Sequence, residues 1–164
     1  MLAKNLQNLF NAQIEIENTA SSEYLHLAIW CASNGFDGSA KFFFKQSEEE
    51  RGHMLKLIHY ALERECTVRA GGPAPSNLKI ETIFDILQAF YDNEKKVTAS
   101  VHKLVDAATE ERDYNAVQFL QWYVQEQHEE ETLARTLIER ARLIGNEGSY
   151  RYFIDKMLED SAGK

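Results

Sequence analysis

The sequence predicts an all-α protein, a four-helix bundle with one long crossover loop and a short fifth C-terminal helix. Four long segments repeat apolar residues at alternating intervals of three and four, which is typical of helices that bury one face in a bundle. No segment alternates apolar and polar β-branched residues as a half-buried strand does. Both prolines, Pro73 and Pro75, fall within the glycine-containing stretch 66–79, which predicts one long loop.

The apolar repeats predict one domain, residues 1–164, with helices at about 4–33, 39–65, 80–111, 114–144 and 149–160. Loops of about five and about three residues join the first and second pairs, so each pair is expected to be antiparallel. The long loop of about 14 residues can span roughly 46 Å, and a helix of about 28 residues is roughly 42 Å long. The second and third helices are therefore expected to run parallel. The fifth helix is too short to be stable alone and is expected to dock on the bundle.

Composition excludes several classes of function. The chain has 164 residues with a net charge of −8, which argues against a general nucleic-acid or anionic-membrane binder. Cys31 and Cys66 show no paired spacing, so we expect a reduced, cytoplasmic protein. No apolar run approaches the roughly 20 residues of a membrane span, and the start of the chain does not resemble a signal peptide.

Each of the four long helices also carries an acid on its apolar stripe. These inward acids are Glu17, Glu50, Glu94 and Glu130. A single buried carboxylate would cost several kcal/mol or become neutral, and a buried salt bridge would be an ordinary explanation for one of them. Four together, with no basic residue on the same stripes, indicate metal ions as the counter-charge. Two ferric ions with one bridging oxide or two hydroxides would balance the four carboxylates.

Two of the helices add a second polar residue three positions from the acid. His53 follows Glu50 on one helical face, where both side chains can bind one ion. Gln127 precedes Glu130 by the same interval. An oxygen-rich site with one or two imidazoles favours iron or manganese over zinc. The sequence therefore predicts a metal site inside the bundle.

Other polar residues lie close to this predicted site. Tyr24 stands seven residues after Glu17, nearly on the same helical face, so it could bond a metal ligand or supply an electron. A core tyrosine with a satisfied hydroxyl fits the same spacing. Around Glu130, at the borders of the stripes, stand the further acids Glu49, Glu126 and Glu129. This second cluster predicts either a third, looser metal position or a solvated acidic face.

These motifs make the chain resemble the bacterial non-haem ferritins over nearly its whole length. The matching stretches include Glu17, Glu94 and residues 115–131. Di-iron bundles of this kind generally contain two Glu-x-x-His motifs, and here the second is replaced by Gln127-x-x-Glu130. That replacement points away from the bacterioferritins. Arg51 stands where they place their haem-binding methionine, so haem is not expected.

The resemblance implies a di-iron centre with specific ligands. One iron is expected on Glu17, Glu50 and His53, and a second on Glu50, Glu94 and Glu130, so that Glu50 bridges the two. The family pattern also implies that Gln127 hydrogen-bonds within the site and that Tyr24 lies beside it. A third iron is implied near the acids Glu49, Glu126, Glu129 and Glu130.

The implied function is iron storage with ferroxidase activity. Such a protein oxidises Fe(II) to Fe(III) with O2 or H2O2 and stores the ferric mineral in a hollow homo-oligomer of 24 subunits. The short final helix is then expected around the four-fold axes. Two alternatives stay open: a passive iron-binding helical shell without ferroxidase activity, and a di-iron oxidase or peroxidase with another substrate.

Overall fold

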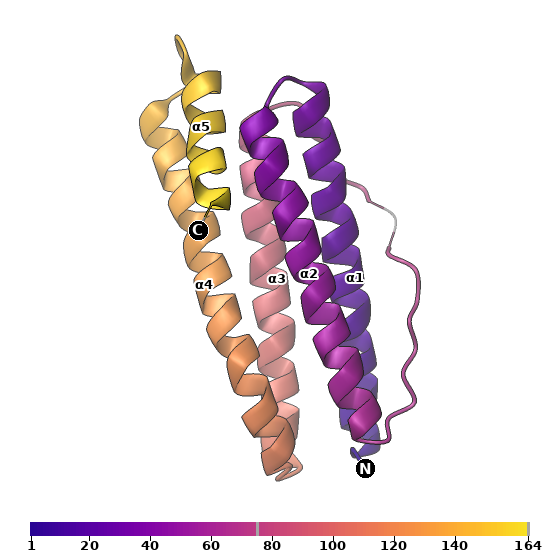
Figure 1. Ribbon diagram of the computed structural model, residues 1–164. Helices are drawn as coiled ribbons and strands as arrows, with labels where there is room; N and C mark the ends of the chain where they lie inside the picture. Colours follow the sequence, from indigo (N-terminus) through magenta and orange to yellow (C-terminus); the bar gives the residue numbers. More distant parts are fainter. Residues whose placement is uncertain (75, 164) are drawn as a thin grey trace.

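A computed structural model describes residues 1–74 and 76–163, and so excludes Pro75 of the predicted loop and the C-terminal Lys164. Its five helices are α1 (Lys4–Ser33), α2 (Asp37–Glu63), α3 (Ile83–Glu110), α4 (Tyr114–Ile144) and α5 (Tyr150–Ala162) (Figure 1). No strand occurs in these described ranges. The predicted all-α four-helix bundle with a short fifth helix is confirmed. No helix in the described part of the chain has a stretch with the length and low polarity of a membrane span.

The long connection from α2 to α3 runs along the height of the bundle, so these two helices point the same way (Figure 1). Side chains of α1 hydrogen-bond to the described part of this connection. Asn11 Nδ2 donates a hydrogen bond to the carbonyl of Thr67 at 3.0 Å, and Asn18 Nδ2 donates to that of Gly71 at 2.8 Å. The single long crossover predicted from loop length is therefore present.

The helix α3 begins later than the apolar stripe predicts, because a capping box sets its first turn. The Thr82 side chain accepts a hydrogen bond from the backbone N–H of Asp85, and the Asp85 carboxylate accepts one from the N–H of Thr82. This reciprocal pair satisfies two N–H groups that the helix itself cannot bond. Residues 80–81 therefore belong to the loop rather than to the helix.

The helix α2 begins earlier than predicted, because α5 supplies its cap. Asp155 accepts hydrogen bonds from the backbone N–H groups of Gly38 at 3.0 Å and Ser39 at 2.7 Å, and from the Ser39 hydroxyl at 2.7 Å. A carboxylate at a helix N-terminus also interacts favourably with the helix dipole. A Cβ on Gly38 would lie 2.6 Å from the Asp155 carbonyl oxygen, so this close approach of α5 to α2 requires glycine.

We expect Asp155→Ala to lower the free energy of unfolding by about 1–2 kcal/mol, because the first turn of α2 loses the side-chain cap that Asp155 supplies. Gly38→Ala should also lower it, although alanine is the better helix former, since the added methyl group meets backbone. Thermal unfolding measures both. Asp160→Ala, an exposed acid on α5, is the control. Unchanged midpoints in the first two variants would show that this contact does not stabilise the fold.

The apolar core is divided into two clusters along the bundle. One contains Phe43 and Phe90, and the other contains Phe10 and Leu120. On each long helix the predicted polar residues stand between the part that enters one cluster and the part that enters the other. The fold therefore brings the inward acids to one level near the middle of the bundle.

Candidate metal centre

Four helices place buried polar side chains in the gap between the two core clusters. They are Glu17 from α1, Glu50 and His53 from α2, Glu94 from α3, and Gln127 and Glu130 from α4. None of these residues is more than 9% exposed. Each belongs to its helix's inward stripe, which is why a helical repeat alone is enough to bring them together.

The tightest group consists of Glu17, Glu50 and His53. One ligand atom from each lies within 4.8 Å of the others, and no other group of three in the described residues meets this geometry. His53 Nδ1 is 3.3 Å from Glu50 Oε2 and 3.8 Å from Glu17 Oε2. Nδ1 is therefore the imidazole nitrogen that faces both carboxylates and could share an ion with them.

Hydrogen bonds from two side chains hold Glu94. The Tyr24 hydroxyl donates to Glu94 Oε1, and Gln127 Nε2 donates to Glu94 Oε2 at 3.1 Å. Asn93 Nδ2 donates to the Tyr24 oxygen at 2.8 Å, which directs the hydroxyl proton toward Glu94. The Tyr24 hydroxyl is therefore satisfied within the core by an inward acid, which fits both interpretations of its spacing.

Glu17 is likewise held by hydrogen bonds from two side chains, Tyr123 and Gln13. Neither residue is among those predicted for the site. The Tyr123 hydroxyl donates to Glu17 Oε1, while Gln13 Nε2 donates to Glu17 Oε1 at 2.6 Å and to the Tyr123 oxygen at 3.0 Å. Both lie on inward stripes, Gln13 four residues before Glu17 and Tyr123 four before Gln127. That spacing is the signal that could have indicated them.

Burial raises the pKa of the inward acids. Desolvation is the largest cause for each of them, and it raises the pKa of Glu17 and of Glu50 well above the usual range. The pKa of Glu94 rises to about 7, and that of Glu130 rises to about 8, where repulsion by Glu94 adds to desolvation. A cation among them would allow all four to ionise together.

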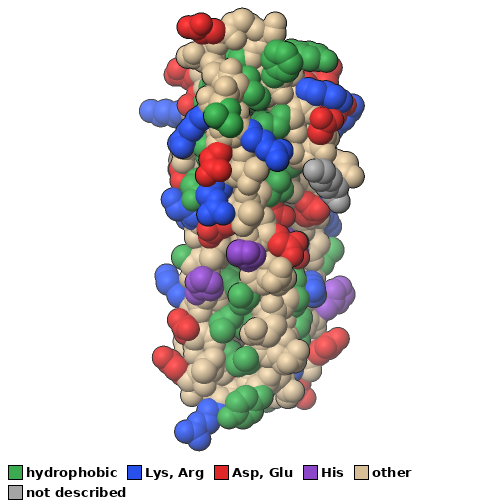
Figure 2. All heavy atoms as spheres, turned by 90° about the vertical axis from the view of Figure 1, so that its left-hand side faces the viewer, with side chains coloured by type: hydrophobic (Ala, Val, Ile, Leu, Met, Phe, Trp, Pro, Cys, Tyr) green, Lys and Arg blue, Asp and Glu red, His purple; other side chains and the backbone are tan. Residues whose placement is uncertain are grey.

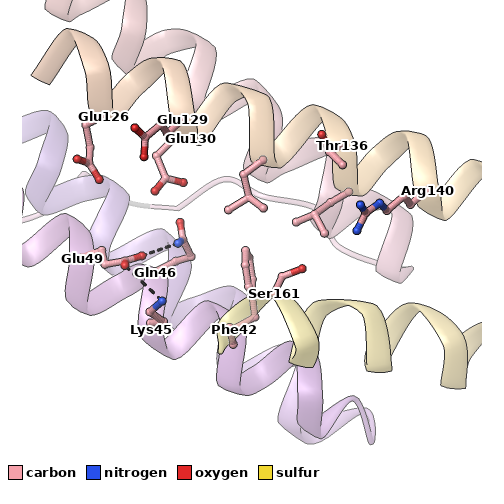
Figure 3. Close-up of a pocket in the computed structure, with 13 residues that line it drawn as sticks. Phe42, Lys45, Gln46, Glu49, Glu126, Glu129, Glu130, Thr136, Arg140 and Ser161 are labelled. Atoms are coloured by element: carbon pink, nitrogen blue, oxygen red, sulfur yellow. Dashed lines mark hydrogen bonds and ion pairs between the residues drawn. The ribbon is translucent and has the colours of Figure 1, made fainter. Parts of the chain in front are cut away.

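The second acidic cluster lines a cavity between α2 and α4 (Figure 3). This cavity has a volume of about 380 Å³ and extends to Ser161 of α5. Its acids are Glu49, Glu126, Glu129 and Glu130. Glu126 Oε1 lies 3.8 Å from His53 Nε2, so the cavity adjoins the buried centre. Glu129 Oε1 instead accepts a hydrogen bond from Gln125 at 2.7 Å. The four acids do not form a closed ligand group as Glu17, Glu50 and His53 do.

Known proteins resemble this chain in both sequence and structure. A family model described as a ferritin-like domain matches residues 7–144. The chain is 36% identical to a probable bacterial non-heme ferritin-like protein of Haemophilus influenzae, covering 100% of this chain and 99% of the relative. It is 35% identical to a bacterial non-heme ferritin of Campylobacter jejuni, covering 99% and 97%.

Solved structures give the same result. An open-pore ferritin from the archaeon Archaeoglobus fulgidus aligns with a TM-score of 0.92 and 31% identity, covering 96% of each chain. A Chlorobium tepidum ferritin aligns with a TM-score of 0.86 and 35% identity, covering 100% of this chain and 98% of that one. The resemblance inferred from the inward acids is thus confirmed, and the chain belongs to the ferritin-like family.

Proposed function

We propose that this chain is an iron-storage subunit that oxidises Fe(II) to Fe(III) at the buried centre. One observation carries the proposal: buried carboxylate oxygens lack any partner. Glu17 Oε2, Glu50 Oε1 and Glu130 Oε2 accept no hydrogen bond, and no Lys or Arg forms a salt bridge with an inward acid in the described ranges. Such oxygens are strongly unfavourable inside a bundle unless a cation binds them.

The proposed ligands divide between two irons. Glu17, Glu50 and His53 would bind one, while Glu50, Glu94 and Glu130 would bind the other. Sharing Glu50 would keep both irons close enough to deliver electrons to one oxidant molecule. Two Fe(II) supply two electrons, which with two protons reduce O2 to H2O2, or H2O2 to two water molecules. The centre binds Fe(II) as a substrate and releases Fe(III) as a product.

The hydrogen bonds around the centre support this role. Gln127 and Tyr24 hold Glu94, and Tyr123 holds Glu17, before any metal arrives. Ligands fixed in advance lose less conformational freedom on binding. We therefore propose that these three residues position the carboxylates of Glu17 and Glu94 and do not themselves bind metal.

We further propose that subunits assemble into a hollow homo-oligomer, with the 24 copies implied by the family resemblance. Apolar side chains remain exposed near one end of the bundle: Leu143 is 88% exposed, Tyr152 66% and Phe153 55%. Figure 2 shows hydrophobic side chains at the surface among charged ones. Subunit contacts would cover such residues. The free, buried Cys31 and Cys66 fit the proposed cytoplasmic location.

We expect a rapid diferric absorbance signal when the metal-free protein is mixed with Fe(II) in air, measured by stopped-flow spectrophotometry. A passive iron-binding shell would take up iron without that signal. A di-iron oxidase or peroxidase with another substrate would instead be favoured by a monomeric or dimeric native mass. Native mass and iron content after purification therefore separate the remaining alternatives.

A further inference from the structure

A buried amide on α2, Gln46, faces the cavity between α2 and α4. It is only 3% exposed and lines the cavity together with Glu49 and Glu130. Its Nε2 donates a hydrogen bond to Glu49 Oε2 at 2.6 Å. Because a carboxylate oxygen only accepts, this bond determines which end of the amide is the nitrogen. Figure 3 shows the carbonyl oxygen of Gln46 pointing away from Glu49, toward Glu130.

That carbonyl oxygen has no partner. Gln46 Oε1 is buried without a hydrogen bond, and so is Glu130 Oε2, which belongs to the same cavity. A buried oxygen without a donor or a cation is unfavourable, and native structures contain few of them. Here two such oxygens line one acidic cavity, which is large enough for an ion and its waters. Their presence indicates that a cation binds between them.

We propose that the carbonyl oxygen of Gln46 is a ligand in the third iron position, together with Glu49, Glu126 and Glu130. The inference rests on the proposed function, and neither sequence spacing nor the family resemblance gives Gln46 a part in it. The same residue also holds Glu49 in place through its amide nitrogen. One side chain thus supplies a ligand and orients the next ligand along the helix.

The chemistry of this position differs from that of the buried centre. An amide oxygen is a hard, neutral donor, so the set consists only of oxygen atoms and favours hard divalent cations over zinc. The cavity is open to Lys45, whose Nζ lies 3.7 Å from Glu49 Oε1. That pair is exposed and weak enough for a divalent ion to displace. We therefore expect weaker binding here than at Glu17, Glu50 and His53, which suits an ion in transit.

The assignment is tested by titrating metal-free protein with Fe(II) under argon and measuring the heat of binding by calorimetry. We expect three ions per wild-type subunit, with the third bound most weakly. In Gln46→Leu, the leucine side chain has nearly the volume of glutamine but neither of its polar atoms. This change should raise the Kd of the third ion at least about tenfold. Gln125→Leu is the matched control, because Gln125 also donates to an acid of this cluster but is exposed and outside the cavity lining.

Gln46→Glu separates the ligand role from the orienting role. It restores an oxygen facing the cavity but loses the donor to Glu49, so we expect it to recover binding of the third ion. A Kd unchanged in Gln46→Leu, no recovery in Gln46→Glu, or only two ions in the wild type would each overturn the assignment. A failure of the proposed function would be observed differently. The wild-type protein would then bind Fe(II) but would not oxidise it rapidly in air.

Discussion

Glu50→Ala should lower the initial rate of Fe(II) oxidation by more than about 100-fold while the protein still folds and assembles. Loss of a residue that only supports a metal ligand typically costs about 10–100-fold, and Glu50 is proposed to bind both irons. The fold should survive because the Glu50 carboxyl is buried, has a raised pKa and leaves Oε1 without a partner. Truncation therefore removes an unfavourable group from the core.

His53→Ala should cause a comparable loss, because His53 Nδ1 is the imidazole nitrogen that lies close to both Glu17 and Glu50. Glu48→Ala and His59→Ala, which change exposed residues of the same helix, should oxidise Fe(II) at the wild-type rate. Stopped-flow absorbance gives the rates, and size-exclusion chromatography reports assembly. A wild-type rate in either site variant would remove this centre from the mechanism.

The architecture could be predicted from periodicity because each helix presents one continuous stripe to the bundle. The helix ends could not all be predicted in this way. Thr82 caps α3 locally and could have been recognised as a capping box, although its partner is Asp85 rather than the more usual glutamate. The cap of α2 comes from Asp155, more than a hundred residues later, so no local pattern contains it.

The inward acids could be predicted because a carboxylate on an apolar stripe contradicts the pattern around it. For Tyr123 and Gln13 the spacing on the inward stripes was the available signal, but only the hydrogen bonds to Glu17 show how they are used. The position of Gln46 depends on which way its amide turns and on a cavity that α4 and α5 close. Both are properties of three-dimensional packing.

Glu130→Gln should stabilise the metal-free protein at pH 8 by roughly 3–5 kcal/mol, because burial raises the pKa of this carboxyl to about 8 from an ordinary value of 4.5. Below pH 4.5 the group is neutral in the folded and unfolded chains, so it carries no cost. Between pH 4.5 and 8 the unfolded chain releases this proton and the folded protein retains it, so wild-type stability falls as pH rises. The glutamine variant avoids that loss.

Urea denaturation with a chelator at several pH values measures the effect. Glu139→Gln, an exposed acid on α4, should change stability by less than about 0.5 kcal/mol at any pH. A Glu130→Gln protein no more stable than the wild type at pH 8 would show that burial does not hold this carboxyl protonated.

Divalent metal should narrow this difference in stability between the wild type and Glu130→Gln. Fe(II) under argon binds only the folded protein's ionised acids, which stabilises the wild type by about 2.7 kcal/mol at 100 times Kd and releases protons. The Glu130→Gln variant loses one ligand and should gain less. The buried acids would then destabilise the fold without metal and stabilise it with metal. This result would indicate that they serve to bind ions rather than to pack the core. If wild type and variant instead gain equally from Fe(II), Glu130 is not a ligand.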